Sequence, residues 1–337
     1  MEFGFSLPGR GPLAQPDVML ALAAKADALG YASLFVTDHV VLPASSDRSV
    51  YPYSPTGKFP GGAAQDYLEP LVTMGHLAHA TKRAKLGTSV LVVPYRNPLL
   101  VAKMLATLDV LSKGRVILGA GVGWLAEEFE ALGAPAFEER GHVTDDYLRL
   151  MRTAWTTDPV TFDSRYYRVK DVHVLPKPVQ RGGIPIWIGG HTDAALRRVA
   201  RLGDAWHPIG NRPPALLLPD EYAAKAAVLH RYTREAGRDP SEITLTLRVP
   251  MQVRSPRAKA LAGERPPFQG TATEVRSDVD TYAALGVRHV IFDSVVPDRR
   301  AALDNLERFA DEVMSRVKHK KPKHAARAGR GGRTRAR

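Results

Sequence analysis

Short apolar segments that alternate with longer segments of helical periodicity constrain this chain more than any other feature. The short segments have the length of buried strands, about four to seven residues. Between them, apolar residues recur every three or four positions, as on one face of a helix. This alternation is typical of repeated strand–helix units around a parallel sheet. The eight strands that it predicts are residues 2–8, 32–39, 86–98, 115–124, 184–190, 204–210, 243–253 and 287–294.

The predicted helices follow most of these strands, and the first carries clear start and stop signals. It begins with Pro16 and Asp17 and ends at Gly30. Proline and acidic residues favour the first turn of a helix, and glycine favours the position just after its end. The predicted helices are residues 16–30, 66–81, 98–112, 143–155, 193–203, 274–286 and 300–317.

Eight strands over residues 1–317 favour a closed (β/α)8 TIM barrel, an α/β fold, over an open doubly wound sheet. The predicted insertions, after strands two and four, are residues 42–64 and 156–184, and the second contains a predicted hairpin. The alternative, two α/β domains, would need a polar linker near the middle of the chain, and none is evident. In a TIM barrel, functional groups lie at the carboxyl ends of the strands. The residues at those ends are therefore the candidates for a functional site.

The residue composition limits the chemistry and the location of the protein. The sequence contains no cysteine, which excludes disulfides, thiolate catalysis and cysteine-ligated metal centres, so redox chemistry would require a bound cofactor. His76 and His79 share a predicted helix without a convergent carboxylate, and we expect no metal site there. No stretch of about 18 apolar residues and no secretory leader is evident. We therefore expect a cytoplasmic protein that has no membrane partner.

The positive charge of the chain is concentrated at its C-terminal end. Residues 318–337 hold nine lysines and arginines and no acidic residue. Removing these nine charges from the formal net charge of +12 leaves +3 for residues 1–317. A segment of this composition is expected to be a disordered basic tail that binds polyanions weakly. A nucleic-acid-binding protein would need basic residues on a folded face as well, and the nearly neutral remainder argues against that function.

Two groups of residues at predicted strand ends carry candidate acid–base chemistry. Asp38 and His39 end the second strand, and an ionisable pair at a barrel rim is a candidate catalytic site. Gly121 belongs to a Gly-x-Gly-x-Gly run that ends the fourth strand and does not complete a dinucleotide-binding fingerprint. Its glycines would allow something flat or bulky to approach the backbone closely. Glu127 or Glu128 would then bind a ligand or cap the following helix.

A candidate anion site follows the fifth strand. Gly189 and Gly190 precede a helix whose N-cap would be Thr192 or Asp193. Backbone N–H groups of a glycine turn, together with the positive end of a helix dipole, form an anion site. A cofactor phosphate would fit this position, although an ordinary glycine turn would have the same sequence.

Taken together, several of these segments identify a family resemblance. The chain contains, in order, "TDH", "LGTSVLVVPYRNPLLVAKMLATLDVLSKGRVILGAGVGW", "EEFEALG" and "IPIWIGGHTDAALRRVARLGDAW". It resembles the luciferase-like monooxygenase superfamily of flavin- and deazaflavin-dependent barrel enzymes over residues 1–316. The block from "LGAGVGW" to "EEFEALG" is most similar to the branch that uses the deazaflavin coenzyme F420. The basic tail lies outside the resemblance.

The resemblance implies roles for individual residues. A non-proline cis peptide between Ser89 and Val90 would support the back of the cofactor ring. The need for space around this peptide would explain why the small polar residues Thr88 and Ser89 lie within an apolar strand. His39 would transfer a proton near the ring. Asp38 would orient His39 or bind the cofactor's hydroxylated chain.

Further implied positions concern the cofactor phosphate and the substrate. Gly189, Gly190 and His191 would hold the phosphate, and Glu127 would face cofactor or substrate. Trp124 occupies the place of the acidic proton donor of sugar-phosphate dehydrogenases in this superfamily. A more apolar small organic substrate, of an aromatic or terpenoid-like kind, is therefore expected.

We accordingly expect an F420-dependent oxidoreductase that transfers a hydride between deazaflavin and substrate. The alternative is an FMN-dependent monooxygenase that uses O2 and a separate reductase. A flavin carrier or sensor without turnover is disfavoured by the pair Asp38 and His39. The resemblance also implies a homodimer.

Overall fold

The computed structural model describes residues 1–256, 263–294 and 298–317. Eight parallel strands form one closed sheet, because β1 pairs with both β2 and β12, and β10 pairs with both β9 and β12. The predicted (β/α)8 barrel is thereby confirmed. The basic tail, residues 318–337, lies outside the described residues. The barrel strands are β1 (Glu2–Ser6), β2 (Ser33–Val36), β3 (Lys85–Thr88), β5 (Val116–Gly121), β8 (Ile186–Gly189), β9 (Ala205–His207), β10 (Thr244–Arg254) and β12 (His289–Ser294).

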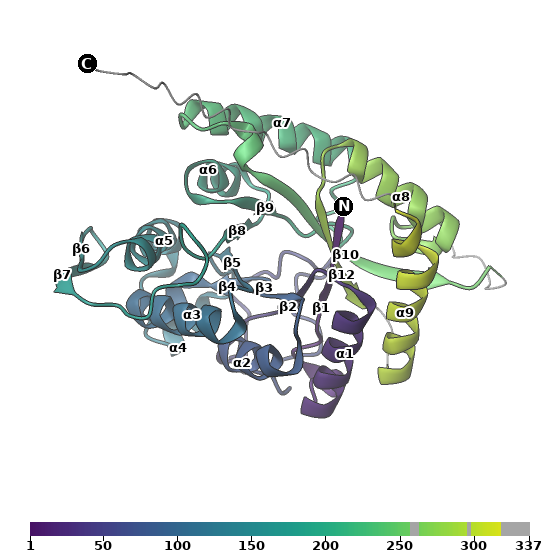
Figure 1. Cartoon of the computed structure of the whole chain (residues 1–337), viewed down its shortest axis with the longest axis horizontal. Coiled ribbons are helices and arrows are strands. Elements are labelled where there is room, and N and C mark those ends of the chain that lie inside the picture. The colour runs from purple at the N-terminus through teal and green to yellow at the C-terminus, as the bar shows by residue number, and fades with distance from the viewer. Residues whose placement is uncertain (257–262, 295–297, 318–337) are drawn as a thin grey trace, which may run out of the picture.

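Helices surround the strands (Figure 1). Each predicted helix is present, but α4 and α7 were not predicted. The α7 helix has few large apolar residues and many alanines and charges, so its helical period is weak in the sequence. The helices are α1 (Pro16–Leu29), α2 (Pro70–Ala80), α3 (Pro98–Ser112), α4 (Ala126–Ala131), α5 (Arg140–Thr156), α6 (Asp193–Leu202), α7 (Pro219–Glu235), α8 (Ala272–Ala284) and α9 (Arg299–Glu312).

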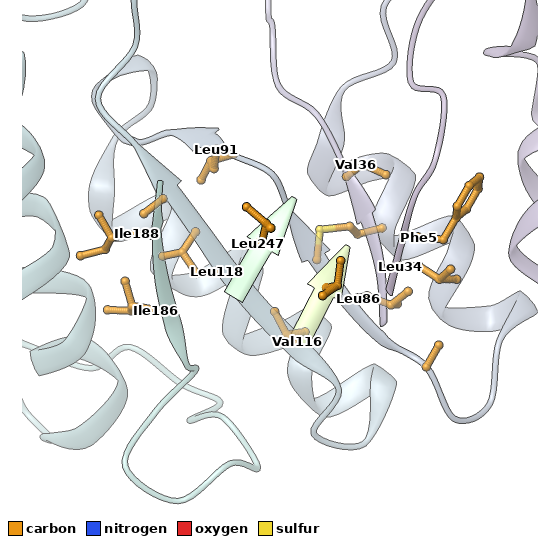
Figure 2. Packing of buried hydrophobic residues seen from close by; sticks show 14 of the residues in the cluster. Phe5, Leu34, Val36, Leu86, Leu91, Val116, Leu118, Ile186, Ile188 and Leu247 are labelled. Atoms are coloured by element: carbon orange, nitrogen blue, oxygen red, sulfur yellow. The ribbon is translucent and has the colours of Figure 1, made fainter. Parts of the chain in front are cut away.

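The main core lies between the strands and the helices. Alternate strand residues such as Leu34, Leu86 and Leu118 are buried there, and Figure 2 shows how they lie on neighbouring strands. The residues between them point into the barrel, where a smaller cluster closes the interior. That cluster consists of Phe35, Ile117, Trp187, Ala205 and Ile291.

The interior becomes polar toward the carboxyl ends of the strands. Ser89, His207, Arg248 and Asp293 are all buried there. Buried polar groups require hydrogen-bond partners, and the partners of these four come from different strands. The apolar cluster therefore supports a polar layer immediately beneath the mouth of the barrel.

The two predicted insertions lie in different places. Residues 42–64 follow β2, at the mouth of the barrel. Residues 156–184 contain the predicted hairpin, formed by β6 (Val160–Asp163) and β7 (Arg168–Val172), but this segment begins at the end of α5. A connection from a helix to the next strand starts at the opposite end of the barrel, and Figure 1 shows the hairpin outside α5. The second insertion therefore follows α5 and precedes β8.

Two further short strands complete the sheet. β4 (Leu91–Val92) continues the direction of β3 and pairs with β5, and β11 (Gln269–Thr271) pairs with the end of β10. The predicted strand 86–98 is thus interrupted between β3 and β4. This interruption lies at the mouth of the barrel.

Candidate active site

A bulge between β3 and β4 forms one wall of the barrel mouth. The peptide bond between Ser89 and Val90 is cis, as the resemblance predicted. The small polar residues Thr88 and Ser89 are needed because their hydroxyl groups form hydrogen bonds inside the barrel. Thr88 Oγ1 donates to Gly119 O at 2.7 Å, and Ser89 Oγ lies 2.7 Å from His207 Nε2. Ser89 thus turns its side chain inward, away from any ligand above the bulge.

Three glycines leave the space that this bulge occupies. A Cβ atom on Gly119 would lie 1.8 Å from Thr88 O, and one on Gly121 would lie 2.4 Å from Val90 Cγ2. A Cβ on Gly189 would lie 3.0 Å from Val90 Cγ1. Contacts under 3 Å are much shorter than normal carbon packing distances. The structure therefore corrects the sequence interpretation of Gly121: its missing side chain makes room for the neighbouring strand.

His39 is held by Glu128, which the sequence had left as one of two alternatives. His39 Nδ1 lies 2.6 Å from Glu128 Oε2, and Tyr95 Oη donates to the same oxygen at 2.9 Å. The N–H groups of Val40 and Val41 donate to Glu128 Oε1 at 2.7 and 3.2 Å. An ionised carboxylate only accepts hydrogen bonds, so Nδ1 must carry a proton. In the neutral imidazole this leaves the lone pair on Nε2 as the proton acceptor.

Asp38 has a different partner from the one expected. Its carboxylate forms two hydrogen bonds with Arg96, both at 2.8 Å, and accepts a third from the N–H of Val92 at 2.8 Å. Burial raises the pKa of the Asp38 carboxyl, and the Arg96 guanidinium opposes this shift. Of the two roles expected for Asp38, orienting His39 is wrong, because Glu128 occupies that position, and binding the cofactor's hydroxylated chain stays a prediction. Asp38 instead connects the end of β2 to β4.

Glu127 anchors the insertion that follows β2. Its carboxylate accepts hydrogen bonds from the N–H of Arg48 at 2.9 Å and from Ser49 Oγ at 2.6 Å. These contacts lower the pKa of Glu127, although partial burial acts in the opposite direction. The expectation that Glu127 faces a cofactor or substrate is therefore not met, since both of its oxygens bind the loop.

The same insertion brings aromatic side chains to His39. Phe59 and Tyr67 lie 5.0 and 5.1 Å from the His39 ring, measured between ring centroids, and Trp124 lies 6.1 Å away. Tyr51 lies 5.0 Å from Trp124. Only the fold of the insertion brings Tyr51 and Phe59 to the strand ends, whereas Tyr67 follows the insertion and Trp124 follows β5.

A second buried network lies beneath the bulge. Thr246 Oγ1 donates to Trp206 O at 2.8 Å and can therefore accept from His207 Nδ1, which lies 3.0 Å away. His207 Nε2 is then the acceptor for the Ser89 hydroxyl. Burial, together with the nearby Arg248 charge, lowers the pKa of His207 to about 3, so this imidazole is neutral near pH 7.

Asp293 binds two arginines at the mouth. Its Oδ1 accepts from Arg248 Nε and Nη2 at 2.8 and 2.7 Å, and its Oδ2 accepts from Arg212 Nη2 at 2.7 Å. Arg248 Nη1 also donates to Ser89. Although burial acts against it, the charges of Arg248 and Arg212 lower the pKa of Asp293. His207 is the last residue of β9 and Asp293 the last but one of β12, but the predicted sixth strand continued to residue 210, so only Asp293 lay near a predicted strand end.

The predicted anion site lies at the end of β8. Gly190 has a φ of 90°, a backbone conformation that favours glycine, and Thr192 is the N-cap of α6, with its side chain accepting from the N–H of Ala195. The other N–H groups of this first turn have no intrahelical acceptor. His191 is partly buried beside this turn, and burial lowers its pKa. The three predicted residues Gly189, Gly190 and His191 are thus together at one helix N-terminus.

No helix within the described ranges is long and apolar enough to cross a membrane. Comparisons with known proteins connect the barrel to enzymes. The family model described as luciferase-like monooxygenase matches residues 1–334. An F420-dependent glucose-6-phosphate dehydrogenase of Microbacterium testaceum is 27% identical over 337 residues, covering 90% of this chain and 94% of that protein.

Two further similarities extend this comparison. An FMNH2-dependent dimethylsulfone monooxygenase of Pseudomonas putida is 33% identical over 187 residues, covering 54% of this chain and 51% of that protein. The crystal structure of the monooxygenase RslO1 from Streptomyces bottropensis has a TM-score of 0.75 at 21% identity, covering 94% of this chain and 99% of that one. The barrel is therefore shared with solved enzymes, and the similar sequences include both F420- and FMN-dependent proteins.

Proposed function

This chain belongs to the luciferase-like monooxygenase family, and we propose that it is an F420-dependent oxidoreductase acting on a small organic substrate. The observation that carries the proposal is the pairing of His39 with Glu128 at the mouth of the barrel, beside the bulge. A neutral imidazole with a fixed tautomer and a basic Nε2 is a suitable general base. Such a group is needed when an alcohol is oxidised, because its hydroxyl proton must be removed.

His39 performs the proton transfer in this proposal. Nε2 accepts the hydroxyl proton of the substrate, and Glu128 stabilises the resulting imidazolium through Nδ1–H. In the reverse direction, the imidazolium returns the proton to the oxygen of the product. Trp124 and Phe59 exclude water around His39 and provide an apolar surface for the substrate.

The residues present fit a deazaflavin on two observations. The α6 N-terminus offers N–H donors for a phosphate, with Gly189, Gly190 and His191 beside it. Val90 provides an apolar surface above the polar layer. The glycines opposite Val90 have no side chains and so leave the space that the bulge requires. When bound, the deazaflavin supplies a carbon that accepts or returns a hydride.

An FMN-dependent monooxygenase is the second candidate. It is favoured by the 33% identity with the dimethylsulfone enzyme and would require a separate reductase to supply reduced cofactor. The same anion site and bulge would serve FMN. We favour F420 because the similarity to the F420-dependent dehydrogenase extends over 90% of this chain, against 54% for the FMN-dependent relative.

Equilibrium titration of the purified full chain with F420 and with FMN tests the proposal. We expect F420 to bind at least about ten-fold more tightly, a free-energy difference of about 1.4 kcal/mol. A preference for FMN would transfer the assignment to the monooxygenase. Binding of neither cofactor would contradict both candidates.

Two glycine variants locate the phosphate in the same titration. Gly190→Val places a side chain 3.2 Å from Ala195 Cβ at the α6 N-terminus, and we expect it to abolish cofactor binding. Gly237→Val is the matched control, since Gly237 also has a positive φ, 75°, but no atom lies within 4 Å of the position that its Cβ would take. Equal affinities for the two variants would contradict the phosphate site.

A further inference from the structure

The guanidinium of Arg212 has hydrogen-bond donors to spare at the barrel mouth. Its side chain is 36% exposed and lies on the loop that follows β9. Among the described residues, its guanidinium makes one hydrogen bond, from Nη2 to Asp293. A guanidinium carries five N–H donors in a planar fork that matches an oxyanion. Four donors are therefore left for a ligand.

Asp293 does not neutralise the charge around Arg212. This single carboxylate is shared with Arg248, whose remaining contacts are to the neutral groups of Ser89. One unit of positive charge is therefore left over. Arg10 adds another cation at the mouth, where its guanidinium lies 4.8 Å from the Phe59 ring centroid. Burial raises the pKa of the Tyr51 phenol, and the charges of Arg248, Arg212 and Arg10 oppose this shift.

On the opposite side of the mouth, negatively charged groups outnumber positively charged ones. There Asp38 and Glu69 share Arg96, and Glu128 binds His39. The three carboxylates of Asp38, Glu69 and Glu128 outnumber the single arginine of this group. A ligand with one anionic end would therefore be oriented with that end away from His39.

Aromatic rings connect the two sides. Trp124 lies 6.1 Å from the His39 ring and 5.0 Å from the Tyr51 ring, and Phe59 lies 5.2 Å from Tyr51. These aromatic side chains contain no carboxylate. The region between the base and the arginines therefore suits an apolar part of a ligand.

We propose that the substrate carries an oxyanion group, a carboxylate in the simplest case, joined to an apolar part, and that Arg212 binds this group. Bidentate hydrogen bonding by Arg212 holds the anion, and the apolar part extends across the rings of Tyr51 and Trp124 toward His39. The inference rests on the proposed function, because it defines the substrate class for the same site. Arg212 is a specificity-determining residue in this arrangement.

The test compares an anion with a neutral molecule of similar shape. Benzoate and benzamide are titrated into the purified full chain by calorimetry, with and without F420. We expect benzoate to bind at least about ten-fold more tightly than benzamide. Arg212→Met keeps most of the aliphatic length and removes the charge, and it should eliminate the preference. Equal binding of the two probes, no binding of either, or a preference that survives Arg212→Met would overturn the proposal.

A matched control and a folding check accompany this variant. Arg231→Met removes an exposed arginine on α7 and should retain the preference. Arg212→Met leaves Asp293 bound to Arg248, so its melting temperature should stay within a few degrees of the original. If it unfolds, Arg212→Lys replaces it: the charge remains but the planar fork is lost, and the preference should fall. A full preference in that lysine variant would overturn the role of the fork.

The anion could instead belong to the cofactor, and a second titration separates the two sources. F420 is compared with its riboflavin-like deazaflavin core, which lacks the phosphate and carboxylates. If Arg212→Met weakens F420 at least about ten-fold but leaves the core unchanged, the anion is the cofactor's and the substrate inference fails. Unchanged F420 affinity with loss of the benzoate preference supports it. Failure of the original protein to bind F420 would instead contradict the proposed function, whatever the result with benzoate.

Discussion

His39 Nδ1 and Glu128 Oε2 lie 2.6 Å apart, although the two residues are 89 positions apart in the chain. His39 follows β2 and Glu128 belongs to α4, so the closed barrel is what brings them together. The Glu128 carboxylate fixes the tautomer of the His39 imidazole. The other hydrogen bonds of Glu128 hold its carboxylate in position. We therefore regard Glu128 as the positioning residue for the proposed base.

Replacing Glu128 by Gln should reverse the His39 tautomer. The glutamine amide can donate to Nδ1, which moves the ring proton to Nε2 and removes the base. We expect turnover to fall by about 100-fold, the effect typical of a positioned acid–base group, with cofactor affinity nearly unchanged. Nitrogen NMR of the imidazole reports the tautomer directly. Glu127→Gln is the control and should leave the tautomer unchanged; the same tautomer in both variants would show that Glu128 does not set it.

Asp38→Asn should reduce stability more than a surface substitution does. It weakens two hydrogen bonds to Arg96 and leaves that half-buried cation with Glu69 as its remaining carboxylate. Breaking a buried ion pair costs about 3 kcal/mol or more. Urea unfolding should show this loss, whereas Glu130→Gln, in an exposed pair with Arg48, should change stability by less than about 1 kcal/mol. An unchanged free energy of unfolding with loss of turnover would restore a catalytic role for Asp38.

Gly119→Ala should be strongly destabilising, because its Cβ would lie 1.8 Å from a backbone oxygen of the bulge. We expect a loss of about 3 kcal/mol in the free energy of unfolding. Gly75, within α2, has no atom within 4 Å of a Cβ position, so Gly75→Ala should instead stabilise the protein by about 0.5–1 kcal/mol. Similar effects of the two alanines in urea unfolding would contradict the steric account of the bulge.

Stability should decrease as the pH falls from 7 to 5, and His207 should account for much of the decrease. Its folded pKa is about 3, against an ordinary value of 6.5, so the unfolded chain binds a proton in this range and the folded protein does not. The expected contribution is about 2 kcal/mol. Urea unfolding of His207→Asn at both pH values should show a smaller decrease by that amount. An equal decrease in variant and original protein would contradict the neutral imidazole.

Much of the fold could be predicted from local patterns. The strand and helix periods, the proline at the start of α1 and Gly30 at its end all act over a few residues, and each predicted strand is present. The α7 helix was missed because its sequence is rich in alanines and charged residues and has few large aliphatic residues to show the helical period. The hairpin was recognised, but its attachment to the end of α5 was not, since a local pattern does not show which element precedes an insertion.

The candidate site was predictable only in part. Strand-end position identified His39, and the family resemblance identified the peptide between Ser89 and Val90. The pairing of Asp38 with His39, one of the two roles predicted for Asp38, was wrong, because residues adjacent in the chain need not act together. In a barrel, the neighbour of a strand end comes from another part of the chain, and here it is Glu128.

The sequence by itself determined the eight-strand barrel and the residues at its carboxyl ends, because hydrophobic period and turn residues act locally. Only the tertiary structure decided which of those residues meet. Closure of the sheet places Glu128 against His39 and Asp293 between Arg212 and Arg248, and the insertion after β2 brings Tyr51 against Trp124. These contacts join residues from distant parts of the chain, so their partners depend on barrel closure and side-chain direction, which no local pattern records.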